Sequence, residues 1–162
     1  MDLTNIFGLA VHWSSDCNMA CTYCYIKKDK SCMHDLNQKI RQSLQDGSYV
    51  NNIKKQLQDR KNQIEHISLW GAEPTINGKY FKDFIIELLD FFPNLSNLMF
   101  STNALIGAKW INEHFINPII EYADNNKRYI NFTIQFSLDG PAWINDASRH
   151  PGATDNTIKT VK

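Results

Sequence analysis

Three cysteines near the start of the chain have the spacing of a metal-binding loop. Cys17, Cys21 and Cys24 form the pattern C-x3-C-x2-C, and we call residues 17–24 the cysteine loop. Three thiolates on one tight loop can bind three corners of a cubane iron–sulfur cluster, which leaves the fourth iron without a protein ligand. An open iron can bind a small chelating molecule, whereas an electron carrier with four cysteine ligands cannot. Both the spacing and the ligand count differ from the ferredoxin pattern C-x2-C-x2-C-x3-C-P.

A zinc site is the alternative use of these cysteines. Its fourth ligand would be Cys32 or His34, which follow the cysteine loop in the sequence. Zinc sites usually pair two short knuckles that are separated by a longer stretch of chain. Three cysteines in one short loop fit that arrangement less well, so zinc ranks second. We expect Cys32 to be a surface or packing thiol rather than a ligand.

The elements that must position this loop follow from the pattern of apolar residues. Short apolar runs predict strands over Gly8–Trp13, Ile64–Trp70, Leu98–Thr102 and Tyr129–Leu138. Helical spacing predicts helices over Asp35–Leu57 with a break near Gly47-Ser48, over Lys79–Phe92, over Lys109–Ala123, and from Thr154 or Asp155 onward. We expect Pro118 to divide the third of these into two short helices, because proline favours the first turn of a helix.

The alternation of strands and helices indicates an α/β fold with a parallel sheet and right-handed crossovers. Either an open doubly wound sheet or a barrel would have this order of elements. A polar or unusual cluster follows each predicted strand, at 14–17, 71–74, 103 and 139–141. The carboxyl ends of parallel strands are where such folds build their sites. These clusters therefore favour a barrel whose active face lies at the strand ends.

The overall composition narrows the class of protein. Of 162 residues, 43% are hydrophobic, and 17 basic residues balance 17 acidic ones, so the net charge is zero. A neutral chain has no overall electrostatic attraction to nucleic acid or to an anionic membrane. No apolar stretch is long enough to span a bilayer, and the first residues lack a signal-type pattern. We therefore expect a cytoplasmic protein, in which reduced cysteines serve metal binding or catalysis.

The cysteine loop resembles the signature of the radical S-adenosylmethionine (SAM) superfamily, C-x3-C-x-aromatic-C, with Tyr23 at the aromatic position. The resemblance implies that Cys17, Cys21 and Cys24 hold a 4Fe–4S cluster and that SAM chelates the open iron. Gly71-Ala72-Glu73-Pro74 resembles the family's Gly-Gly-Glu-Pro, with Ala72 at the second glycine. In the family, this backbone and the glutamate receive the amino group of SAM.

Two later segments extend the resemblance. Thr102-Asn103 resembles the pair that lines the SAM pocket, although Asn103 could instead cap the next helix. The segment from Ser137 to Arg149 resembles Ser-Leu-Asp-Gly…His-Asp-x-x-Arg of the peptide- and protein-modifying branch, the relatives of anaerobic sulfatase-maturating (SPASM-type) enzymes. Asn145 stands where that branch often has histidine. The resemblance implies that Ser137 and Asp139 contact SAM and that Arg149 either pairs with the SAM carboxylate or bridges the loop to the barrel.

The resemblance implies an oxygen-sensitive oxidoreductase that cleaves SAM reductively to a 5′-deoxyadenosyl radical. It implies a peptide or protein substrate and an external electron donor such as flavodoxin or ferredoxin, but it assigns no catalytic residue. The alternatives are a glycyl-radical-enzyme activase and a non-catalytic zinc or iron–sulfur module. Family members form a partial TIM barrel of (β/α)6 type. We therefore expect residues 1–162 to be the N-terminal part of this domain, with only the first four strand–helix units and an unpaired apolar edge at the fourth strand.

Overall fold

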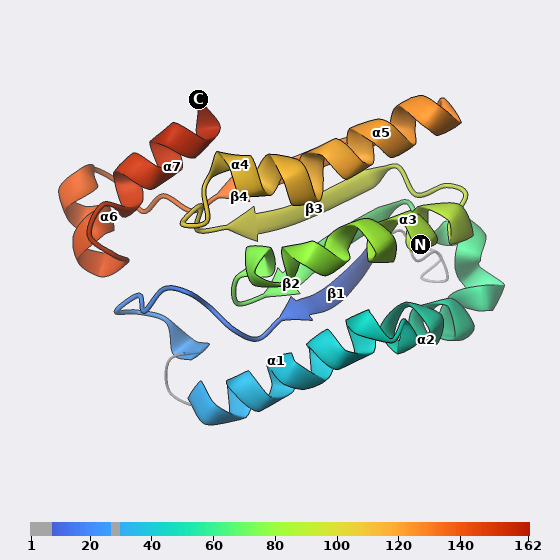
Figure 1. Cartoon of the computed structure of the whole chain (residues 1–162), viewed down its shortest axis with the longest axis horizontal. Coiled ribbons are helices and arrows are strands. Elements are labelled where there is room, and N and C mark those ends of the chain that lie inside the picture. Colours follow the sequence, from blue (N-terminus) through green and yellow to red (C-terminus); the bar gives the residue numbers. More distant parts are fainter. Residues whose placement is uncertain (1–7, 27–29) are drawn as a thin grey trace, which may run out of the picture.

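Four parallel strands form one sheet at the centre of the fold (Figure 1). The computed structural model describes residues 8–26 and 30–162, and the side chains of residues 30–32 lie outside this description. The sheet has the order β1-β2-β3-β4, so strands that follow one another in the chain are also neighbours in space. The strands are β1 (Gly8–Ser14), β2 (His66–Gly71), β3 (Asn97–Thr102) and β4 (Asn131–Phe136). This sheet confirms the predicted α/β fold, and it is consistent with a partial (β/α) barrel.

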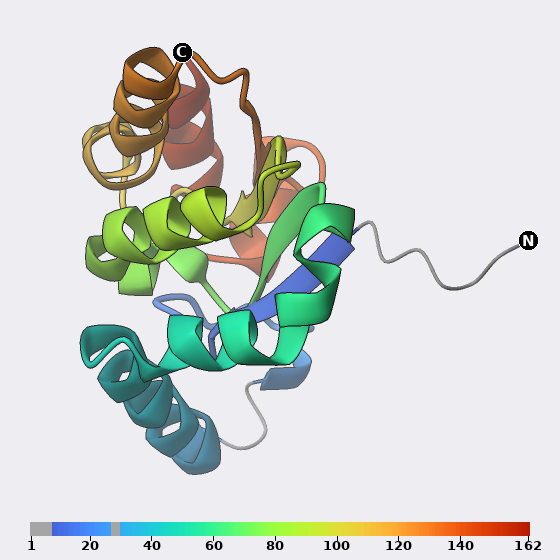
Figure 2. The ribbon, with the colours of Figure 1, turned by 90° about the vertical axis from the view of Figure 1, so that its right-hand side faces the viewer.

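Helices separate the strands in sequence. They are α1 (Lys30–Gln45), α2 (Ser48–Leu57), α3 (Phe81–Phe91), α4 (Ala108–Ile111), α5 (Asn117–Asn126), α6 (Ala142–Ser148) and α7 (Ala153–Val161). Two 3₁₀ segments, Gln58–Gln63 and Pro74–Tyr80, lead into β2 and α3. Helices α2, α3 and α5 lie on the same side of the sheet (Figure 2). No helix in residues 8–26 and 30–162 has the length and apolar character needed to cross a membrane.

The core fills the space between the sheet and these helices. Alternate strand residues such as Trp13, Ile67 and Phe100 are almost fully buried there, against Phe84 and Leu88 of α3. The Trp13 indole N–H also donates to the carbonyl oxygen of Pro74, at 3.0 Å. This bond ties the end of β1 to the turn after β2, so the apolar core fixes the relative position of the two loops that carry the chemistry.

The predicted break in the first helical segment is confirmed at Gly47. Gly47 separates α1 from α2 and has φ of 72° and ψ of 0°, a left-handed conformation that glycine adopts without steric cost. The helix before it begins at Lys30, five residues earlier than the apolar pattern indicated. The extra turn lies next to the cysteine loop in sequence and has too few periodic apolar residues to be predicted.

The predicted division at Pro118 is confirmed in part: α5 begins at Asn117 with Pro118 in its first turn, but no break separates it from α4. Helical structure runs without interruption from Ala108 to Asn126, and residues 112–116 form a π-helical turn just before the proline. In this turn the backbone N–H of Asn117 donates to the carbonyl oxygen of Asn112, five residues back. The wider turn accommodates the missing N–H of Pro118 without ending the helix.

A candidate SAM and iron–sulfur site

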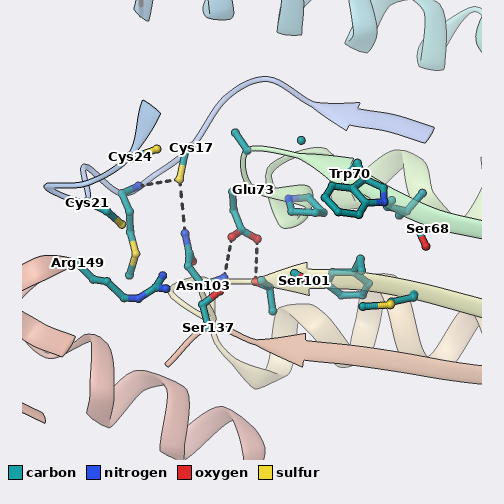
Figure 3. Close-up of a pocket in the computed structure, with 18 of the residues that line it drawn as sticks. Cys17, Cys21, Cys24, Ser68, Trp70, Glu73, Ser101, Asn103, Ser137 and Arg149 are labelled. Atoms are coloured by element: carbon teal, nitrogen blue, oxygen red, sulfur yellow. Dashed lines mark hydrogen bonds between the residues drawn. The ribbon is translucent and has the colours of Figure 1, made fainter. Parts of the chain in front are cut away.

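The loops after all four strands meet around one cavity of about 270 Å³. Figure 3 shows the cysteine loop on one side of this space and the ends of the strands on the other. Ten of the predicted site residues line the cavity: Cys17, Cys21, Tyr23, Cys24, Gly71, Ala72, Glu73, Asn103, Ser137 and Arg149. The structure therefore brings together residues that lie more than 100 positions apart in the sequence.

The cysteine loop is shaped by hydrogen bonds to its own backbone. The Asp16 carboxylate accepts from the N–H of Cys17 at 3.2 Å, and the N–H of Met19 donates to the Cys17 sulfur at 3.4 Å. The N–H of Cys24 donates to the carbonyl oxygen of Cys21 at 3.1 Å, which closes a tight turn between these two residues. Cys17, Cys21 and Cys24 are all free thiols. The loop thus presents three unpaired sulfur ligands to the cavity.

The environment of Cys17 disfavours an isolated negative charge. Burial raises the pKa of the Cys17 thiol to about 11, and the nearby Glu73 carboxylate adds to this shift, whereas the Met19 N–H opposes it. A bound metal reverses this balance, because its positive charge stabilises a coordinating thiolate. The site is therefore suited to cysteines that lose their protons when a metal centre binds.

The turn after β2 packs directly against the end of β1. Gly71 has φ of 129°, and a Cβ atom there would lie 1.8 Å from the carbonyl oxygen of Ser14. The next residue, Ala72, donates its N–H to the same oxygen at 2.8 Å, and the N–H of Glu73 donates to the carbonyl oxygen of Asp16 at 3.0 Å. Only glycine fits at position 71. Ala72 is not among the non-glycine residues with positive φ, so alanine fits the backbone at that position without strain.

Glu73 is a buried carboxylate at the centre of the site, with only 1% of its surface exposed. Its Oε1 accepts from the N–H and hydroxyl of Thr75, at 3.1 and 2.7 Å, and from the hydroxyl of Thr102 at 2.8 Å. Its Oε2 accepts from the backbone N–H of Asn103, at 2.8 Å. All these donors are neutral, and none of the ion pairs found among the described residues involves Glu73.

Asn103 connects the end of β3 to the cysteine loop. Its side-chain amide lies 3.7 Å from the Cys17 sulfur (Figure 3). The same amide donates to the Asn18 side chain at 2.8 Å. Its side-chain oxygen accepts from the N–H of Leu105 at 2.9 Å, which stabilises the turn after the strand. The residue thus stabilises this turn and also lines the cavity. It does not cap a helix directly, because α4 begins only at Ala108.

The residues that follow β4 are arranged differently from one another. Ser137 lines the cavity, and its N–H donates to the carbonyl oxygen of Thr102 at 2.9 Å. Asp139 is not among the lining residues; it contacts Tyr23 and Arg149 instead. Asn145 is fully buried, and its side chain accepts from the N–H of Asp139 at 3.0 Å. The buried Asn145 side chain therefore stabilises the loop after β4 through its hydrogen bond to Asp139.

The sequence analysis assigned Thr102 to the SAM pocket but did not predict the hydrogen bonds that hold Glu73 in place. Thr75 and Thr102 both donate to its carboxylate, and Glu73 is the N-cap of the 3₁₀ segment that begins at Pro74. Proline in the first turn of a helical segment favours a capping side chain at the residue before it. The Glu73-Pro74 pair could therefore have indicated that Glu73 caps this segment. The contact between Glu73 and Thr102 could not be predicted locally, because it depends on the pairing of β2 with β3.

The zinc alternative takes its fourth ligand from Cys32 or His34. His34 forms a pair with Asp16 at 3.3 Å, and the side chain of Cys32 lies outside the described residues. Within the described part of the chain, no three Cys, His, Asp or Glu side chains lie close enough to bind one metal ion.

Comparison with known proteins adds one finding. Residues 11–162 match the family model that describes the radical SAM superfamily. A search of curated proteins found no match to the chain. The family match covers the whole of the sheet from the fourth residue of β1 onward, together with every loop that lines the cavity.

Proposed function

Because the chain belongs to the radical SAM superfamily, we propose that Cys17, Cys21 and Cys24 hold a 4Fe–4S cluster and that the adjoining cavity binds SAM. The superfamily implies an enzyme that cleaves SAM with the help of such a cluster. The observation that carries the residue assignment is that three free cysteines and the buried Glu73 carboxylate line the same cavity.

The charge of the cavity favours a cationic ligand. A buried carboxylate that receives only neutral hydrogen bonds has a strong tendency to bind a positive group. Oε1 of Glu73 already has three donors, whereas Oε2 has one and retains capacity for another. We assign this oxygen to the ammonium group of SAM, with Gly71 and Ala72 forming the backbone wall beside it.

Two further residues have roles that follow from their positions. The Ser137 hydroxyl lies at the end of β4 and lines the cavity, where it can donate to the SAM carboxylate or ribose. Asn103 keeps the cysteine loop at a fixed distance from the strand ends through Asn18 and Cys17. When bound, a reduced 4Fe–4S cluster supplies the electron that cleaves SAM to methionine and the 5′-deoxyadenosyl radical.

We place the chain in the peptide- and protein-modifying branch, of SPASM type. The segment from Ser137 to Arg149 supports this, because it resembles the branch's sequence pattern except at Asn145, and its two end residues line the cavity. The cavity also extends over Ser68, Trp70 and Ser101, on the face of the sheet opposite the apolar core. This face offers space for a peptide or protein substrate, and a flavodoxin or ferredoxin in the cytoplasm would supply electrons.

We also propose that residues 1–162 form the N-terminal part of a larger radical SAM domain. Ile130, Phe132 and Ile134 of β4 and the segment before it line a groove against α5. β4 pairs with β3 on one side, and within the described residues no strand pairs with its other side. Light scattering tests this proposal: oligomers or aggregates are expected, and a stable monomer that modifies a peptide would contradict it.

The residue assignments are tested by anaerobic reconstitution with iron and sulfide, followed by calorimetric titration with SAM. The wild-type chain should become brown and bind SAM, whereas Cys21→Ala should bind neither the cluster nor SAM. A colourless zinc protein, or SAM binding that survives in Cys21→Ala, would contradict the assignment. An assay for 5′-deoxyadenosine in the presence of candidate peptides encoded nearby tests the branch, and a peptide-dependent increase is expected.

A further inference from the structure

Three side chains from separate loops contact one another at the rim of the cavity. The Tyr23 hydroxyl donates to Oδ2 of Asp139 at 2.6 Å. Arg149 donates to both oxygens of the same carboxylate, from Nε at 2.7 Å and from Nη2 at 2.6 Å, and its guanidinium lies 5.7 Å from the centre of the Tyr23 ring. Tyr23 belongs to the cysteine loop, Asp139 to the loop after β4, and Arg149 to the end of α6.

The backbone joins the same two regions. The N–H of Thr22 donates to the carbonyl oxygen of Ser148 at 2.8 Å, and the Thr22 hydroxyl lies 3.3 Å from that oxygen. On the far side, the buried Asn145 accepts from the N–H of Asp139 and donates to the Thr154 hydroxyl of α7, each at 3.0 Å. The cysteine loop is therefore hydrogen-bonded to the end of α6, and Asn145 of α6 in turn bonds to the loop after β4 and to α7.

These contacts occupy the carboxylate of Asp139 and the guanidinium of Arg149, two groups that the family resemblance had assigned to SAM. The two Asp139 oxygens accept from three donors, and Arg149 uses two of its three guanidinium nitrogens on that carboxylate. Arg149 holds the pKa of Asp139 below its usual range, so the carboxylate is charged at neutral pH. A bidentate, charge-assisted pair of this kind is among the stronger polar contacts in proteins.

We propose that Tyr23, Asp139 and Arg149 form a clamp that positions the cysteine loop before either cofactor binds. The proposal rests on the proposed function, because it takes the cysteine loop as the cluster-binding segment. Tyr23 lies between Cys21 and Cys24, so holding its hydroxyl restrains both of these cysteines. The three residues are positioning residues for the cluster, and Arg149 bridges the loop to the barrel instead of pairing with the SAM carboxylate.

Hydrogen–deuterium exchange of the metal-free chain tests the clamp without any cofactor. Tyr23→Phe should increase the exchange rate over residues 17–26 by about tenfold, because one hydrogen bond to a charged group is lost. Asp139→Asn should increase it at least as much, because it also removes the charge that pairs with Arg149. Tyr122→Phe is a matched control, since Tyr122 donates to Asp90 at 2.7 Å and has Arg128 beside it, far from the site. This control should leave residues 17–26 unchanged. Wild-type exchange over residues 17–26 in Tyr23→Phe would overturn the proposal, whether or not Asp139→Asn folds.

The reconstituted protein supplies a second readout. In Tyr23→Phe, the electron paramagnetic resonance signal of the reduced cluster without SAM should differ from the wild-type signal, and iron should pass to a chelator about fivefold faster. Tyr122→Phe should match the wild type in both measurements. A Tyr23→Phe protein with wild-type exchange and iron release, but SAM binding tenfold weaker, would show that Tyr23 is a SAM ligand instead. If no cluster assembles at all, the proposed function fails, while the exchange result still decides whether the clamp exists.

Discussion

Replacement of Glu73 by glutamine removes a buried negative charge from the cavity and keeps the length and shape of the side chain. In the structure, Oε1 accepts three hydrogen bonds and Oε2 accepts one from the Asn103 N–H. The glutamine oxygen is expected at the Oε1 position, because it alone can satisfy the three donors there. The amide NH₂ then faces both the Asn103 N–H and the ammonium of SAM. Each of these groups is a hydrogen-bond donor, so neither can bond to the NH₂ and both contacts become repulsive.

The size of the effect on SAM binding follows from this geometry. Removing one partner of a buried, hydrogen-bonded charge pair costs about 2 kcal/mol or more, which is about 30-fold in Kd. The effect on folding is smaller, since losing a hydrogen bond to a charged acceptor costs about 1.5–3 kcal/mol, and relief of the buried charge offsets part of that. We therefore expect a folded Glu73→Gln protein that retains its cluster and binds SAM at least about 30-fold more weakly.

Calorimetry on reconstituted protein measures this change, with cluster content checked by iron and sulfide analysis. Glu121→Gln is the matched control, because Glu121 is exposed and pairs with Lys82 at 3.5 Å on the helical side of the fold. It should bind SAM as the wild type does. A Kd for Glu73→Gln within threefold of wild type, at equal cluster content, would refute the role of Glu73 in binding the ammonium group.

Three other changes have expected outcomes. Alanine variants of each of the three loop cysteines should lose iron, whereas Cys32→Ala should retain it; near-normal iron in the Cys21 variant would contradict this. Gly71→Ala should destabilise the chain by at least about 3 kcal/mol in urea unfolding, because its Cβ would lie 1.8 Å from a backbone oxygen, whereas Gly140→Ala, at φ of 142° in open space, should cost about 1–3 kcal/mol. Asp146 accepts from backbone N–H groups at the start of α7, chiefly that of Thr154, which lowers its pKa, so its stabilising effect should be present at neutral pH and disappear as the pH falls below about 3.9. Urea unfolding of Asp146→Asn should therefore differ from the wild type at pH 7, and this difference should shrink steadily as the pH falls below about 3.9; a difference that stays the same between pH 7 and the acid limit of folding would contradict the assignment.

The parts of the fold that depend on local pattern were predictable from the sequence. The apolar runs located all four strands to within about two residues, and Gly47 marked the break between α1 and α2 because its backbone needs a left-handed conformation. The cysteine spacing and the polar residues at the strand ends were sufficient to place the cavity, since parallel strands bring their carboxyl ends to one edge.

The remainder depends on contacts between distant segments, which periodicity does not encode. The π turn before Pro118 forms within a helix that packs on the core through Phe115 and Ile119, so tertiary packing outweighs the local effect of proline. Helix α6 spans only seven residues and has one buried residue, Asn145, so it lacks an apolar stripe. The hydrogen bond from Tyr23 to Asp139 joins residues 116 positions apart, and no local signal predicts such a contact.

In the proposed function, three cysteines hold a cluster with one iron open to SAM. Low-temperature electron paramagnetic resonance of the dithionite-reduced, reconstituted chain tests it most directly, with spectra recorded before and after the addition of SAM. The wild-type chain should give the signal of a reduced 4Fe–4S cluster whose line shape changes when SAM binds. Glu73→Gln should lose that change at the same SAM concentration. Identical spectra with and without saturating SAM, or a protein that contains zinc and gives no cluster signal, would contradict it.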